Sequence, residues 1–103
     1  MNRDLRRHKR VKIPEDAGVS CEGIDTDLRG PVLVMGMRGA FIRTPVVFPK
    51  GTILDMRIRD GEREVETRCA VRDLQPEGIG VEFVQLGSSQ EESLKSILKR
   101  LGG

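Results

Sequence analysis

The stretch that decides the fold is residues 53–73, which read ILDMRIRDGEREVETRCAVRD. Residues 53–59 and residues 63–73 each alternate apolar and charged side chains, the period of a strand with one buried face. Asp60-Gly61 between them predicts a tight two-residue turn. We therefore expect an antiparallel hairpin in which Arg57 and Arg59 lie near Glu64 and Glu66 on the solvent face.

Shorter strands are expected on both sides of this hairpin. Each is a short apolar or alternating run that ends at glycine or proline, the residues that most often interrupt strands. Residues 75–78 predict a further turn, before the last strand. The expected strands are residues 18–23, 31–35, 40–44 and 79–83, preceded by a brief extended segment at residues 10–13.

The C-terminal residues change from a strand period to a helical one. Leu94, Ile97, Leu98 and Leu101 recur at helical spacing and predict a helix over residues 88–101. Ser88 is the expected N-cap, with Glu91 as the N3 residue of a capping box. The apolar face of this helix needs a surface to cover, most simply the mouth of a barrel. The expected fold is mainly β: an antiparallel barrel of about six strands with a C-terminal α-helix.

The charge of the chain is unevenly distributed. The 103 residues carry a net charge of +2, but residues 1–12 hold six basic side chains and one acid, and the rest hold 12 basic and 15 acidic ones. We expect a basic N-terminal arm at residues 1–12 and one barrel domain at residues 13–103. A basic arm is typical of anion binding, although a purely solvated terminus has the same composition.

The sequence offers no catalytic set. His8 is the only histidine, and Cys21 and Cys69 have no further cysteine or histidine at metal-binding spacing. Both cysteines lie in alternating strand patterns and are expected to be reduced core thiols. No segment has the length of a membrane span or the apolar core of an export signal, so a cytoplasmic protein is expected. We expect no enzyme activity, no metal, no cofactor and no membrane insertion.

A glycine turn lies between two of the apolar runs. Gly36-Met37-Arg38-Gly39 separates residues 31–35 from residues 40–44, and glycine lets a backbone approach a ligand closely. Two glycines are also common where a turn simply needs positive φ. Arginines, by contrast, bind phosphate or a guanine edge through two parallel hydrogen bonds. The arm and this turn together favour a purine phosphate ligand.

Taken together, these motifs resemble the PilZ domain family, whose members are receptors for the bacterial second messenger cyclic di-GMP. The resemblance covers nearly the whole chain. It rests on Arg6 and Arg10, which fit the family's Arg-x-x-x-Arg arm, on residues 35–44 (MGMRGAFIRT) and on residues 78–83 (GIGVEF). It implies a six-stranded barrel with a C-terminal helix, the architecture already expected from the periodicity.

The resemblance also implies a ligand site. Arg6 and Arg10 would bind phosphate and guanine with help from Arg7, and Gly36 and Gly39 would let the sheet approach the base. In the family's Asp/Asn-x-Ser-x-x-Gly motif, the first two defined positions are here Val34 and Gly36, neither of which can form the family's hydrogen bonds to guanine. Arg38 is the candidate substitute, as a partner for a phosphate or a base.

Three functions are compatible with these features. The leading interpretation is a cyclic di-GMP receptor that signals to an unidentified effector protein by ordering its basic arm over the barrel. The first alternative is a degenerate PilZ domain that does not bind cyclic di-GMP and acts as a protein–protein adaptor in motility or pilus control. The second is a nucleic-acid-binding barrel, which the acidic body and the scarcity of aromatic residues disfavour (three Phe, no Trp, no Tyr).

Overall fold

The computed structural model describes residues 10–102, which form seven strands, a short 3-10 helix and one α-helix. The two arginines Arg6 and Arg7 lie outside these residues. The elements in chain order are β1 (Val11–Lys12), η2 (Glu15–Ala17), β2 (Val19–Gly23), β3 (Arg29–Met35), β4 (Gly39–Arg43), β5 (Ile53–Asp60), β6 (Arg63–Gln75), β7 (Gly78–Gln85) and α1 (Ser88–Arg100).

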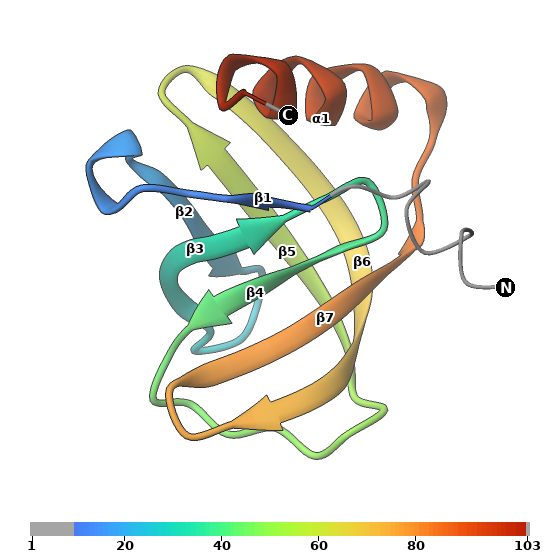
Figure 1. The fold of residues 1–103 in the computed structure, drawn as a ribbon. Helices are drawn as coiled ribbons and strands as arrows, with labels where there is room; N and C mark the ends of the chain where they lie inside the picture. The colour runs from blue at the N-terminus through green and yellow to red at the C-terminus, as the bar shows by residue number, and fades with distance from the viewer. Residues whose placement is uncertain (1–9, 103) are drawn as a thin grey trace, which may run out of the picture.

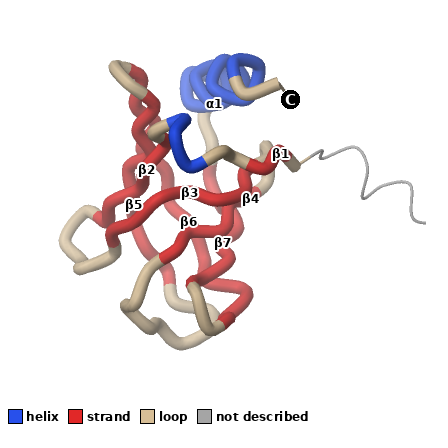
Figure 2. Tube along the Cα trace, turned by 60° about the vertical axis from the view of Figure 1, so that its left-hand side comes forward, coloured by secondary structure: helices blue, strands red, loops and turns tan. Residues whose placement is uncertain are grey.

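Six of the strands close into an antiparallel barrel, as predicted. Around the barrel the order is β3-β2-β5-β6-β7-β4, and β4 returns to pair with β3. The brief first strand, β1, pairs with the C-terminal half of β3, beyond the part of β3 that pairs with β2. Figures 1 and 2 show α1 across one end of this barrel and the loop between β4 and β5 at the other.

The inner faces of the strands form the core that the alternation predicts. Leu54, Met56 and Ile58 of β5 are at most 4% exposed. The apolar residues of β6 and β7 that are buried with them are Val65, Cys69, Ala70, Val71, Ile79, Val81 and Phe83. Cys21 and Cys69 also lie in this core as free thiols, each with its Sγ 3.5 Å from Sδ of Met56. Burial raises the pKa of both thiols to about 12.

The central hairpin is confirmed, but its turn lies one residue later than predicted. Asp60 still belongs to β5 and pairs with Arg63, so that Gly61 and Glu62 form the two-residue loop. Gly61 has a φ of 63°, and glycine at the first loop position is the pattern of a type II′ turn. The shift turns the side chain of Asp60 inward, where it is buried.

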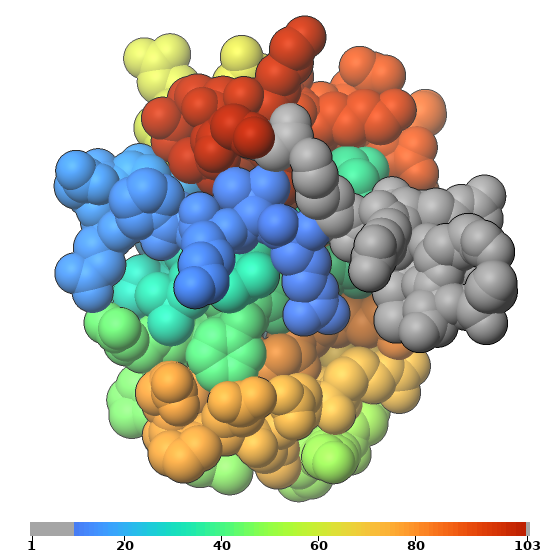
Figure 3. Space-filling model, viewed as in Figure 1, coloured from blue at the N-terminus to red at the C-terminus, as the bar shows by residue number. Residues whose placement is uncertain are grey.

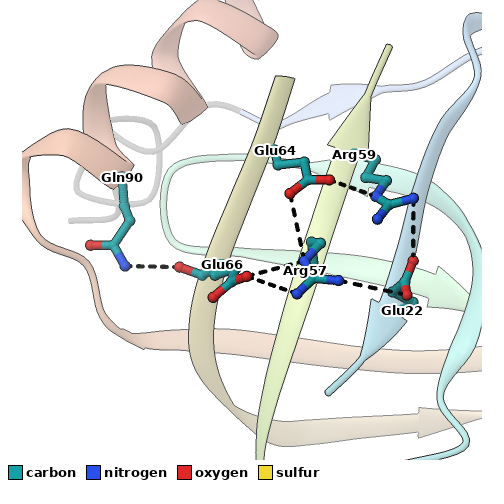
Figure 4. Close-up of polar contacts among 6 residues, drawn as sticks. All are labelled: Glu22, Arg57, Arg59, Glu64, Glu66 and Gln90. Atoms are coloured by element: carbon teal, nitrogen blue, oxygen red, sulfur yellow. Dashed lines mark hydrogen bonds and ion pairs between the residues drawn. The ribbon is translucent and has the colours of Figure 1, made fainter. Parts of the chain in front are cut away.

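The solvent face of the hairpin carries the ion pairs expected from its sequence. Arg57 lies 2.8 Å from Glu66, and Arg59 lies 2.9 Å from Glu64. Glu22 of β2 extends the cluster, because it approaches both arginines at 3.7–3.8 Å, as Figure 4 shows. These paired charges join three neighbouring strands and explain the charge of residues 53–66 without a ligand.

The C-terminal helix packs on the barrel through Leu94, Ile97 and Leu98, all buried as predicted. Its N-terminus begins one residue earlier than expected, with Gly87 as N-cap in place of Ser88 and Gln90 as N3 in place of Glu91. The Gln90 side chain accepts the Gly87 N–H at 2.6 Å and donates to the Glu66 carbonyl at 2.8 Å. Because a side chain at Gly87 would meet Gln90 Oε1 at 2.7 Å, the glycine makes room for this cap.

Candidate functional site

The glycine turn connects β3 to β4 and is held from two sides. The Gly36 N–H donates to the Gly39 carbonyl at 2.9 Å, which closes the turn. The Phe83 N–H of β7 donates to the Arg38 carbonyl at 2.8 Å, which ties the turn to the neighbouring strand. Gly36 is buried, Met37 is half-buried and Arg38 is exposed. The turn therefore presents the Arg38 side chain on a fixed backbone.

Gly39 is needed for a close approach between strands. A Cβ at this position would lie 2.2 Å from the Val81 carbonyl oxygen of β7, far inside van der Waals contact. Neither Gly36 nor Gly39 is among the positive-φ glycines of residues 10–102, which are Gly18, Gly51, Gly61 and Gly102. The explanation by positive φ is therefore wrong here, and the glycine at 39 serves the packing of β4 against β7.

The basic arm joins the barrel beside this turn. In the antiparallel pairing of β1 with β3, Val11 lies opposite Met35 and Lys12 lies opposite Val34. Arg10 directly precedes Val11, so the chain enters the barrel at the end of β3 where the turn begins. Arg10 is exposed. Of the predicted ligand residues, the structure thus brings together Arg10, Gly36, Arg38 and Gly39.

A row of outward-facing residues crosses five strands next to the turn. Phe41 faces outward because its neighbours Ala40 and Ile42 are buried in the core. The pairing continues the row on both sides of Phe41. From β1 to β6 it runs Lys12, Val34, Phe41, Gly80 and Asp73. Figure 3 looks onto this side of the molecule, with β3 and β4 in cyan and green between β1 in blue and β7 in orange.

Charged side chains border the row at the turn. Glu82 of β7 lies directly opposite Gly39 in the sheet. Its carboxylate accepts a hydrogen bond from Arg72 Nε of β6 at 2.8 Å and lies 3.8 Å from a guanidinium nitrogen of Arg38. All three side chains are more than one-third exposed. The outer face of β3, β4 and β7 thus combines a half-buried apolar centre with a cationic border.

The protein-family model named PilZ domain matches residues 4–100 of this chain. The chain belongs to the PilZ domain family. Members of this family are receptor or adaptor domains. The described outer face holds Arg10, the segment from Val34 to Gly39 and the start of β7, which belong to the segments on which the resemblance in the sequence rested.

Solved structures share this fold at low sequence identity. The crystal structure of the uncharacterised Legionella protein Lpg0364 superposes with a TM-score of 0.64 at 17% identity, over 90% of this chain and 92% of that one. The Bacillus subtilis inhibitor of motility MotI/DgrA gives a TM-score of 0.70 at 20% identity. That match covers 97% of this chain, which spans only 51% of MotI/DgrA. A comparison with curated protein sequences gave no match.

The described part of this PilZ domain was found to contain neither a candidate metal site nor a helix that could span a membrane. Residues 10–102 contain no group of three or more His, Cys, Asp or Glu side chains that could hold a metal ion. Within the same residues, no helix combines the length and the apolar character that crossing a membrane requires.

Two residues of this face, Arg72 and Glu82, were not predicted as site residues from the sequence. The alternation of residues 63–73 and 79–83 does place both on solvent faces. The alternation does not predict that β4 pairs with β7, because these strands are far apart in the chain and only barrel closure joins them. The resemblance to the family at residues 78–83 was the available signal that β7 lies in the same motif set.

Proposed function

We propose that this PilZ domain is a receptor for cyclic di-GMP, with its ligand on the outer face of β3, β4 and β7. The observation that supports the proposal most is the register of β1 on β3. It brings Arg10, the last residue of the Arg-x-x-x-Arg arm, to the turn that carries Arg38. Arginine guanidinium groups bind phosphates and the O6/N7 edge of guanine through paired hydrogen bonds.

The proposed contacts follow from this arrangement. Arg6 and Arg10 bind phosphate and guanine, with Arg7 assisting, and Arg38 supplies a further cationic contact from the turn. Gly36 and Gly39 carry no side chain at the two ends of the turn, so that a base can approach the backbone there. Two phosphates give the ligand two negative charges for these guanidinium groups.

The sequence of the turn limits the expected affinity. Val34 faces outward at the family's Asp/Asn position and cannot accept a hydrogen bond from guanine. Each guanine group desolvated without a partner costs about 1–3 kcal/mol. With Gly36 also lacking a hydroxyl, the affinity is expected to be about 10²–10⁴-fold weaker than with both groups present, unless Arg38 compensates.

Signal transmission requires a second protein in this proposal. Binding brings residues 1–9 over the outer face and so changes the surface that the domain offers to an effector. Because the fold resembles that of a motility inhibitor, motility control is the first process in which to look for this effector.

The proposal is tested by calorimetric titration of cyclic di-GMP into the purified chain, with GMP as the ligand control. We expect saturable binding that is lost in Arg6→Ala and in Arg10→Ala, with the circular dichroism spectrum unchanged. Arg29→Ala is the matched protein control, because Arg29 is exposed on the same strand as Met35 but about 20 Å away along it. Wild-type affinity in Arg10→Ala, or equal loss in Arg29→Ala, would contradict the proposed site.

A second candidate is a protein–protein adaptor, which the row around Phe41 specifically favours. Val34, Phe41 and Gly80 are adjacent across three strands and offer no side-chain hydrogen-bonding group to a guanine. A partner protein would cover such a surface without any nucleotide. Absence of any heat with cyclic di-GMP at high concentration of the folded protein would favour this function.

A further inference from the structure

Glu82 lies where an anionic ligand would have to bind. Its carboxylate on the outer face of β7 receives a hydrogen bond from Arg72 Nε at 2.8 Å and lies 3.8 Å from Arg38. The Glu82 side chain is 37% exposed, whereas those of Arg38 and Arg72 are 61% and 57% exposed. The carboxylate is therefore the most enclosed of the three groups, with the two guanidinium groups beside it.

The balance of charge here differs from that of the ion-pair cluster on the hairpin. In that cluster, on β2, β5 and β6, three glutamates surround Arg57 and Arg59. Glu82, by contrast, forms ion pairs with two arginines that come from different parts of the chain, the β3–β4 turn and β6. A phosphate could accept hydrogen bonds from the same two guanidinium groups, because each has five N–H donors.

Carboxylates and phosphates bind the same planar fork of an arginine. A ligand phosphate near Gly39 thus competes with Glu82 for Arg38 and Arg72. It also meets the negative charge of Glu82 itself, which repels it.

We propose that Glu82 is an internal competitor of the ligand: its carboxylate holds Arg38 and Arg72 until a phosphate of cyclic di-GMP replaces it, and this exchange sets the concentration at which the domain responds. The inference rests on the proposed receptor function and adds to it a residue that tunes affinity. Glu82 acts through the two arginines and contributes no bond to the ligand.

The test is the affinity of the Glu82→Gln variant for cyclic di-GMP, measured by calorimetry beside the wild-type chain. Glutamine keeps the size of the side chain and removes its charge. Exposed ion pairs are worth about 0.2–1 kcal/mol each, so releasing two of them predicts binding that is about 2- to 30-fold tighter. The gain should largely vanish when Arg38→Ala and Arg72→Ala are combined with Glu82→Gln, because the competition acts through these two arginines.

Glu64→Gln is the matched control. It removes one negative charge from a glutamate that pairs with an arginine at 2.9 Å, but Glu64 lies near the other end of β6 from Arg72. Tighter binding in Glu82→Gln and wild-type affinity in Glu64→Gln support the inference. Suppose that the wild type binds cyclic di-GMP, but Glu82→Gln binds it no more tightly, or Glu64→Gln gains as much affinity. Either result overturns the inference and leaves the receptor function standing. Absence of binding in both the wild type and Glu82→Gln overturns both.

Discussion

Single residues of the outer face differ in how strongly the fold constrains them. Gly39 is set by the close approach of β4 to β7, since a Cβ would lie 2.2 Å from the Val81 oxygen. Val34 has no such constraint, because its side chain faces outward beside Lys12 and Phe41. The fold therefore requires the glycine, whereas the side chain at position 34 can be changed to test the proposed ligand contact.

Gly39→Ala is predicted to destabilise the barrel. The added methyl group must push β4 away from β7, and overpacking of this kind costs about 1–3 kcal/mol. Urea unfolding measures the loss. Gly80→Ala is the control and should lose less stability, because the nearest atom to its Cβ would be Asp73 Cβ at 3.1 Å, and none of the three nearest atoms belongs to the backbone. Equal stability of Gly39→Ala and the wild type would contradict this account of Gly39.

Val34→Asp is predicted to strengthen cyclic di-GMP binding. It restores the carboxylate that the PilZ motif has at this position, next to the cation of Lys12. One recovered hydrogen bond to guanine, worth about 1–3 kcal/mol, corresponds to about 5- to 150-fold tighter binding by calorimetry. Val34→Thr has the same shape without a carboxylate and should show a much smaller gain. If Val34→Asp binds no better than Val34→Thr, guanine does not contact this position.

At the scale of the elements, α1 is fastened to the barrel at both ends. Gln90 ties its N-terminus to the Glu66 carbonyl of β6. Arg100 at its C-terminus binds the buried Asp60 carboxylate of β5 through two guanidinium nitrogens and lies 3.3 Å from the Ala17 carbonyl. Donating hydrogen bonds to the Asp60 carboxylate raises the pKa of Arg100. Since Asp60 is buried, Arg100 offsets the cost of burying its carboxylate.

Arg100→Ala is therefore predicted to lower the urea midpoint of unfolding, because it leaves the Asp60 carboxylate buried without its partner. Arg100→Lys should recover part of the loss, since an ammonium keeps the charge but not the paired geometry. Arg63→Ala, at an exposed arginine opposite Asp60 in the hairpin, is the control and should change the midpoint little. A midpoint for Arg100→Ala equal to that of Arg63→Ala would show that this contact does not hold the helix.

The elements also show how far the sequence predicts the structure. Period-2 alternation and the helical period were enough to predict the strands, the hairpin and the buried face of α1, because both periods report local burial directly. The positions of the hairpin turn and the helix N-cap each differed by one residue. At the turn, the buried contact between Asp60 and Arg100 keeps Asp60 in the strand. At the helix, Gln90 bonds both Gly87 and Glu66. The Asp60–Arg100 and Gln90–Glu66 contacts each join segments that are far apart in the sequence.

The candidate site shows the same limit. Arg10, Arg38 and the glycines could be named from motifs, but Glu82 and Arg72 could not, since their proximity to the turn follows from the pairing of β7 with β4 and β6. Arg6 and Arg7 remain predictions, because they lie outside the described residues.

At the scale of the whole molecule, the barrel encloses two free thiols, Cys21 and Cys69, in its core. Burial raises the pKa of Cys21 and of Cys69 to about 12, whereas thiols in the unfolded chain ionise near 8.5. Between these values the unfolded state binds fewer protons than the folded state, so the free energy of unfolding falls as the pH rises. Below pH 8 the thiols contribute no such dependence.

The free energy of unfolding, measured in urea between pH 8 and pH 10.5, is therefore predicted to fall more steeply in the wild type than in the double variant Cys21→Ala/Cys69→Ala. Comparing slopes within each protein removes the cavity cost of the substitutions and the titration of lysines common to both. In the native wild type, both thiols should react with a thiol reagent at pH 8 far more slowly than in urea. Identical slopes, or rapid native labelling, would contradict the burial of the thiols.

In the proposed receptor, the barrel holds Arg10 and the glycine turn at one face, where cyclic di-GMP binds. The measurement that tests this central claim most directly is a ¹⁵N–¹H NMR titration with cyclic di-GMP, because it reports both binding and its location. We predict saturable shifts of the amides of Arg10, Gly36, Arg38 and Gly39, with little change at Lys50 and Glu77 at the far end of the barrel and none with GMP. Absence of shifts at millimolar ligand, or shifts centred on the far end, would contradict the account.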